Sequence, residues 1–138
     1  MLTRSDLQRL AQLRLEDAIL LLKANRSSSA YYLAGYSVEL ALKACIAKLV
    51  QPDTIPEKAF INAVYTHKLD NLMATAGLRP QFDADTKADQ QFAAYWIITN
   101  NWSEDSRYEF WDPISATTLL QAITDPSHGV FQWVKQYW

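Results

Sequence analysis

The side chains that can do chemistry in this sequence are few and lie far apart along the chain. The only histidines are His67 and His128, and the only cysteine is Cys45. A zinc site needs several histidine, cysteine or carboxylate ligands at close spacing, and neither histidine has such a cluster beside it. The sequence therefore predicts no metal site and no cofactor. No recognisable signature places a catalytic histidine next to Cys45, so we interpret it as a small core residue.

Arg107 is the first candidate for a binding residue. It precedes Tyr108 in the stretch 100–112, which has no clean helical period and is expected to be an ordered loop. With Trp102 and Trp111 nearby, its guanidinium can bind a phosphate or the carboxylate of a partner. The alternative is a structural arginine that pairs with Glu104, Asp105 or Glu109. These three acids, together with Asp112, would repel a phosphate.

Glu39 is the second candidate, because the segment around it is otherwise almost entirely apolar. A buried carboxylate must find a partner or stay protonated. Lys43, Arg107 or a tyrosine hydroxyl can supply that partner, in which case the bond specifies the fold. In a functional interpretation, Glu39 joins Tyr36 and Trp96 in lining a groove for a small ligand.

Aromatic residues are numerous enough to suggest an interface. Five tryptophans exceed what a core of this size buries easily, and tryptophan and tyrosine are enriched at protein interfaces. We expect core or dimer packing, rather than base stacking, from the aromatic residues of the second helix, the middle of the chain and its carboxyl end: Tyr31, Tyr32, Tyr36, Tyr95, Trp96, Trp133, Tyr137 and Trp138.

Composition excludes several classes of protein. The chain has 138 residues, 49% hydrophobic, with 13 basic and 15 acidic side chains, which argues against disorder. The longest uncharged stretch, Gln90 to Ser103, is too short and too polar to span a membrane. One cysteine and no basic-then-apolar opening segment favour the cytoplasm. The first 50 positions have an excess of basic over acidic residues, but the basic residues are scattered, which makes a nucleic-acid footprint weak.

Helical periodicity runs through most of the chain, and nothing alternates cleanly enough to require a sheet. Thr3 or Ser5 can cap the first helix, and Gly35 implies that another group packs closely on the second. The sequence predicts one all-α domain over residues 1–138, a bundle of four or five helices. Helices are expected over Ser5–Asn25, Ala30–Leu49, His67–Ala76 (capped by Thr66), Asp83 or Asp85 to Thr99, and from Pro113 to Tyr137, where the break at Asp125–Pro126 either kinks one helix or starts a last one at Pro126.

Three segments together resemble the HEPN domain family. The run from Tyr32 to Ala44, in which Glu39 precedes Leu-Ala-Leu-Lys-Ala, is similar to the family's central helix. The stretch 66–72, Thr-His-Lys-Leu-Asp-Asn-Leu, resembles its His-x-Leu-x-x-Leu segment, and Arg107-Tyr108 resembles its Arg-Tyr element before the final helix. The order and spacing of all three fit, and the resemblance spans roughly Ser5 to Trp138.

The resemblance implies a small helical domain that dimerises and is often encoded beside a nucleotidyltransferase in toxin–antitoxin or defence systems. Many members are metal-independent ribonucleases, whose signature is an arginine followed by a histidine after four to six positions. Here no arginine has a histidine at that distance; Asp112, Pro113 and Ile114 stand there after Arg107. His67 matches the family's histidine; the alternative is a structural role, as a neutral imidazole in the first turn of a helix. His128 is expected to be a solvated residue of the Pro126–Gly129 turn.

The sequence therefore predicts a non-catalytic, HEPN-like binding module that forms a homodimer and pairs with a nucleotidyltransferase. The alternative is a diverged ribonuclease or RNA-binding toxin with a site around Arg107. The candidate binding residues are Arg107, Tyr108, Glu39, Tyr36 and Trp96, and the only candidates for catalysis are Arg107 and His67.

Overall fold

The computed structural model describes residues 1–138 and is entirely helical, with eight α-helices, one 3-10 helix and no strand. This confirms the all-α class, but the chain has more helices than the four or five expected. The elements in chain order are α1 (Arg4–Lys23), α2 (Ser27–Ala47), α3 (Lys58–Val64), α4 (Leu69–Thr75), α5 (Arg79–Ala88), α6 (Gln90–Asn100), η1 (Glu104–Tyr108), α7 (Pro113–Thr124) and α8 (Val130–Lys135).

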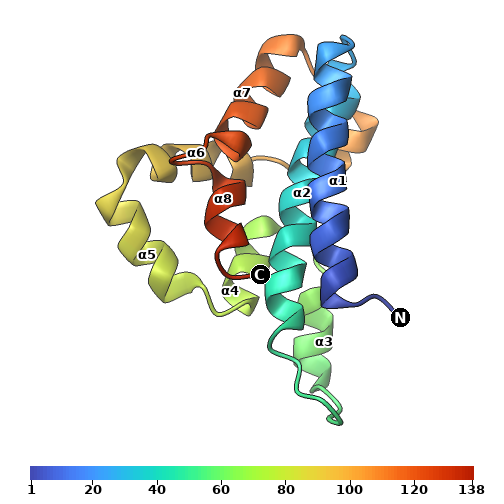
Figure 1. Cartoon of the computed structure of the whole chain (residues 1–138), viewed down its shortest axis with the longest axis vertical. Helices are drawn as coiled ribbons and strands as arrows, with labels where there is room; N and C mark the ends of the chain where they lie inside the picture. The colour runs from blue at the N-terminus through green and yellow to red at the C-terminus, as the bar shows by residue number, and fades with distance from the viewer.

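The two longest helices, α1 and α2, form an antiparallel hairpin along the length of the molecule (Figure 1). Thr3 caps α1 in a reciprocal capping box with Asp6, as one of the two predicted caps. α7 and α8 lean against α2, while α5 stands at the edge of the molecule. None of the helices is long and apolar enough to cross a membrane.

α2 is the centre of the fold. Thirteen of its 21 residues are buried, and α1, α4, α7, α8 and η1 all pack on it. Its apolar sequence on nearly all sides is typical of a helix flanked in this way. Tyr36 and Glu39 lie on this helix, and the packing of α4 and η1 on it brings the segments of His67 and Arg107 close.

The sequence prediction of one helix from Asp83 or Asp85 through Thr99 is wrong, because two helices occupy this stretch. The backbone of Asp89 is extended (φ −131°, ψ 96°), and its side chain accepts a hydrogen bond from the Phe92 amide. Asp89 thus ends α5 and caps α6. The aspartate expected to cap, Asp85, instead accepts a hydrogen bond from Trp133 Nε1 at 2.8 Å.

Other boundaries also differ from the predicted ones. Residues 58–64 form α3, which apolar periodicity in so short a segment does not reveal. α8 begins at Val130 rather than Pro126, because Asp125 accepts hydrogen bonds from the Ser127 and His128 amides and holds a turn there. α2 begins at Ser27 rather than Ala30. The expected loop 100–112 contains η1.

Candidate functional site

One face of α2 carries the polar tips of four residues: Tyr32, Tyr36, Glu39 and Lys43. Their spacing of four, three and four residues places them along a single stripe of the helix. α4 and η1 pack on α2, and they bring His67 and Arg107 into this neighbourhood. The candidate site is therefore built around a helix face, and the connecting segments before α4 and in η1 complete it.

Glu39 is the most buried charged group on this face, with a side chain only 2% exposed. Its Oε1 accepts hydrogen bonds from Lys43 Nζ and His67 Nδ1, both at 2.9 Å. Of the partners proposed from sequence, Lys43 is confirmed and Arg107 is not. Oε2 is also buried and has no hydrogen-bond partner. The carboxylate thus joins α2 to the segment that leads into α4.

His67 lies two residues before α4 begins, so the prediction that it occupies the first turn of that helix is wrong. Lys68 is the N-cap, and Thr66 Oγ1 accepts only the Lys68 amide at 3.3 Å. A carboxylate has no proton to give, so Nδ1 carries the proton towards Glu39. This leaves Nε2 free on a ring that is 45% exposed. The arrangement orients the imidazole as a carboxylate orients the histidine of a catalytic pair.

Arg107 forms no ion pair with a carboxylate, although four acids lie within five residues of it. The prediction of a structural pair with Glu104, Asp105 or Glu109 is therefore wrong. Its guanidinium lies over the ring of Tyr108, 4.9 Å from the ring centroid. The Tyr108 phenol, with that of Tyr32, raises the pKa of Arg107 above its ordinary value. Arg107 is an exposed cation held by aromatic side chains.

Trp102 connects the two parts of this face. Its ring lies directly against Gly35, where an added Cβ would stand 2.2 Å from the ring atoms. Tyr32 stacks between Trp102 and Tyr36, with centroids 6.2 and 5.9 Å away. Burial, followed by the Glu39 carboxylate, raises the pKa of Tyr36. The close packing that Gly35 predicted is confirmed, with Trp102 as the group that requires it.

The segment after Arg107 is fixed to the start of α2. Trp111 stacks face to face on Tyr31, with 3.8 Å between centroids and 8° between ring planes. The Ser27 hydroxyl donates to the Trp111 carbonyl at 2.7 Å, and the Trp111 amide donates to Ser28 Oγ at 2.8 Å. The first two residues of α2, Ser27 and Ser28, therefore bind this segment.

Trp96 lies away from the candidate site. It is 5% exposed, and its ring packs edge-on against Phe82 at 5.1 Å, within an aromatic cluster that includes Phe92 and Trp133. α6 packs on α5, α7 and α8. The structure therefore separates Trp96 from Tyr36 and Glu39, with which the sequence grouped it.

Cys45 has the properties expected of a core residue. It is 3% exposed, and burial raises the pKa of its thiol to about 11. The thiol is therefore protonated at neutral pH, and only the thiolate is an effective nucleophile.

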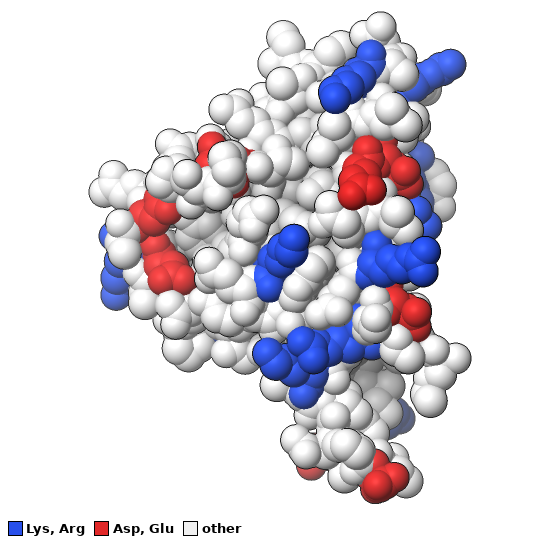
Figure 2. All heavy atoms as spheres, viewed as in Figure 1, with Lys and Arg blue, Asp and Glu red and all other residues white.

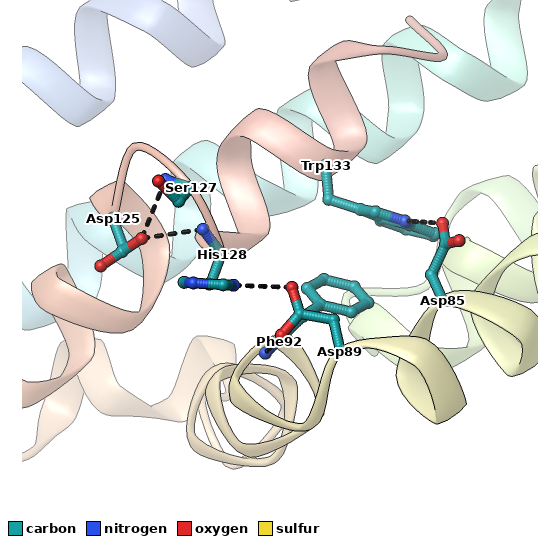
Figure 3. Close-up of polar contacts among 7 residues, drawn as sticks. All are labelled: Asp85, Asp89, Phe92, Asp125, Ser127, His128 and Trp133. Atoms are coloured by element: carbon teal, nitrogen blue, oxygen red, sulfur yellow. Dashed lines mark hydrogen bonds and ion pairs between the residues drawn. The ribbon is translucent and has the colours of Figure 1, made fainter.

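His128 is not the solvated turn residue that the sequence predicted. Its Nδ1 lies 2.7 Å from Oδ2 of Asp89, and Figure 3 shows the ring placed between Asp89 and Asp125. A second link, from Trp133 Nε1 to Asp85, joins the same elements. Asp89 raises the pKa of His128 above 6.5, and the bond to His128 lowers the pKa of Asp89 below 3.8. The α7–α8 turn is thereby tied to the α5–α6 junction.

We expect the stabilisation from this pair to depend on pH. It is complete below the unfolded-state pKa of His128, near 6.5, and is lost as pH rises through the raised folded-state value. On the acid side it persists above 3.8 and is lost as pH falls through the lowered pKa of Asp89. Urea unfolding of wild type and His128→Gln should differ most near pH 5 to 6 and converge at alkaline pH. A difference that grows above neutral pH would contradict the assignment.

In comparisons with known proteins, the chain matches no family model, no curated protein and no solved structure.

Proposed function

We propose that this chain is a HEPN-like binding module that acts through protein contacts rather than through catalysis. The single observation that carries the proposal is the state of Arg107, an exposed guanidinium that no carboxylate of the chain neutralises and that lies over the Tyr108 ring. Arginine and aromatic residues are the types most enriched at the centres of protein interfaces. The surface from Arg107 to Ile114 is called the 107–114 segment below.

The 107–114 segment also exposes large apolar side chains. Tyr108 is 75% exposed, Phe110 is 99% exposed and Ile114 is 79% exposed. Between them, Trp111 is locked to α2 by its stack on Tyr31 and by the serine hydrogen bonds. A surface ordered before binding loses little conformational entropy on binding, which favours affinity. This segment, anchored at Trp111 and carrying exposed apolar side chains beside the unpaired Arg107 guanidinium, supports the proposal of a docking site.

The partner we propose first is a second copy of the chain. The first 50 residues carry seven basic and four acidic side chains, and the remainder carries six and eleven. In a two-fold dimer, each copy can therefore place its acid-rich later half against the basic earlier half of the other. With the HEPN resemblance, we place the dimer in a cytoplasmic toxin–antitoxin or defence-type system, with a nucleotidyltransferase as its heterologous partner.

A ribonuclease or RNA-binding toxin is the second candidate, and the Glu39–His67 hydrogen bond favours it. His67 Nε2 can accept the proton of a ribose 2′-hydroxyl, and Arg107 can stabilise charge on the phosphate. Asp112, at a position where the family's histidine would stand, does not replace it. It caps α7 through Ser115, whose amide and hydroxyl lower its pKa, so it is ionised and cannot act as the acid.

One set of variants distinguishes the two candidates. At micromolar concentration, light scattering should give the mass of a dimer for wild type. Phe110→Ala and Arg107→Ala should weaken the dimer about tenfold or more, because each removes an interface anchor. Ile55→Ala is the control, since Ile55 is 94% exposed but lies outside the 107–114 segment. A wild type that remains strictly monomeric would contradict the homodimer.

The same proteins should be incubated with RNA in the presence of a chelator. We expect no cleavage by wild type at concentrations equal to that of the RNA. Cleavage that disappears in both Arg107→Ala and His67→Ala would refute the non-catalytic proposal and establish the second candidate. On the face shown in Figure 2, one group of basic side chains gathers below the centre, and acidic and uncharged side chains separate the others, so no continuous basic surface of the kind typical of RNA-binding proteins crosses this face.

A further inference from the structure

A cavity of about 360 Å³ lies between the segment leading into α4 and the end of α6. His67, Lys68 and Asn71 line it from one segment, and Asn100, Trp102 and Glu104 line it from the other. Its volume falls within the range of about 300–1,000 Å³ typical of small-molecule sites. The 107–114 segment does not contribute to it, so this cavity is a separate feature of the molecule.

One buried polar atom of a residue in the wall of this cavity lacks a partner. Trp102 is 3% exposed and forms part of the wall, and its indole Nε1 donates to nothing in the chain. Oε2 of Glu39 accepts nothing, and the same carboxylate holds His67 at the cavity wall through Oε1. An unpartnered buried donor costs about 1–3 kcal/mol, so the Trp102 indole N–H points to a missing acceptor.

The charges of the two walls are opposite and unpaired. Lys68 forms no ion pair on the α4 side, and Glu104 forms none on the η1 side, whereas Asp70, also in the wall, is bound to Arg79 at 3.1 Å. The asparagine side chains in the wall make no hydrogen bonds within the protein and offer both donors and acceptors. A ligand with one anionic group, one cationic group and further polar atoms would complement both walls.

We propose that this cavity binds a zwitterionic α-amino acid with a polar side chain. The ligand carboxylate lies towards Lys68 and the Trp102 indole N–H, and the ligand ammonium lies towards Glu104. The asparagine amides bind the polar side chain. A nucleotide fits the same walls poorly, because its phosphate would meet two carboxylates and only one free ammonium group.

Calorimetric titration of the full chain with L-glutamine, L-asparagine and L-serine tests the proposal. We expect at least one of them to bind with a millimolar or better Kd. N-acetylation or methyl esterification of that amino acid should weaken binding about tenfold or more, because each removes one charged hydrogen-bonding group. Adenosine serves as the nucleoside arm, and its binding in the absence of amino-acid binding would overturn the proposal.

Two matched pairs of variants assign the binding to this cavity. Glu104→Gln should weaken the amino acid about tenfold, while Asp105→Asn, which changes the neighbouring acid outside the wall, should not. Lys68→Met should weaken it similarly, while Lys58→Met on α3 should not. Circular dichroism verifies that each variant is folded. No heat from any amino acid up to about 10 mM, or equal affinities within each pair, would refute the proposal.

Discussion

Replacing Gly35 by alanine is expected to lower the free energy of unfolding by about 2–3 kcal/mol. The added Cβ would stand 2.2–2.3 Å from three ring atoms of Trp102, far inside van der Waals contact. Trp102 is 3% exposed and is stacked against Tyr32, so its ring cannot move aside without disturbing the neighbouring packing. Either the ring or α2 must therefore shift. Urea unfolding of the purified variant measures the cost.

The sign of this prediction is informative because helix propensity acts in the opposite direction. Alanine in place of glycine inside an exposed helix stabilises it by about 1 kcal/mol. A Gly35→Ala variant as stable as wild type, or more so, would thus show that Trp102 does not lie on Gly35. The control is a double-mutant cycle with Trp102→Ala. Removing the ring should abolish most of the cost of Gly35→Ala, because the two groups are in direct contact.

This contact also shows what local sequence reasoning can predict. A glycine in an apolar helix implied a close neighbour, and the structure confirms one. The Asp112–Pro113 start of α7 is confirmed as well, because an N-cap followed by proline is a signal contained within a few residues. The helix α1 follows from apolar periodicity over many turns, and α2 follows from a long segment that is apolar on nearly all sides. In each case the signal lies within one short or regular segment, although the group that packs on Gly35, Trp102, is distant in the sequence.

The candidate site was predicted less completely because its interactions join distant residues. Glu39 was predicted to need a partner, yet His67 is 28 residues away and reaches it only because α4 packs on α2. His128 meets Asp89 across 39 residues. Arg107 shows the opposite case, because the acids close to it in sequence do not pair with it. In η1 its guanidinium lies over the Tyr108 ring instead. Neighbours in sequence are therefore a poor guide to ion pairing outside regular helices.

Replacing Glu39 by alanine is the second large effect we expect, also about 2–3 kcal/mol of unfolding free energy. The change empties a fully buried volume and removes the acceptor shared by Lys43 and His67. Breaking a buried charge pair can cost about 3–5 kcal/mol. The cost here is lower, since the side chains of Lys43 and His67 are 18% and 45% exposed and can reach water.

The loss should be concentrated at α4, which gives the prediction a readout beyond overall stability. His67 immediately precedes the N-cap of α4, so its bond to Glu39 fixes the entry of the chain into that helix. Hydrogen exchange of the amides at the carboxyl end of α4 should therefore accelerate in Glu39→Ala more than exchange in α7 does. Glu16→Ala, on the exposed side of α1, is the control and should change stability by at most about 0.5 kcal/mol.

A double-mutant cycle between Glu39→Ala and His67→Ala separates the hydrogen bond from the cavity that alanine leaves. If the bond stabilises the fold, the coupling free energy should be about 1 kcal/mol, because the loss of either partner already removes it. Additive costs would mean that Glu39 acts only by filling space. Additivity would then also mean that the Glu39 carboxylate does not hold the His67 ring in place. The strongest structural argument for acid–base chemistry at His67 Nε2, an imidazole oriented by a carboxylate, would be lost.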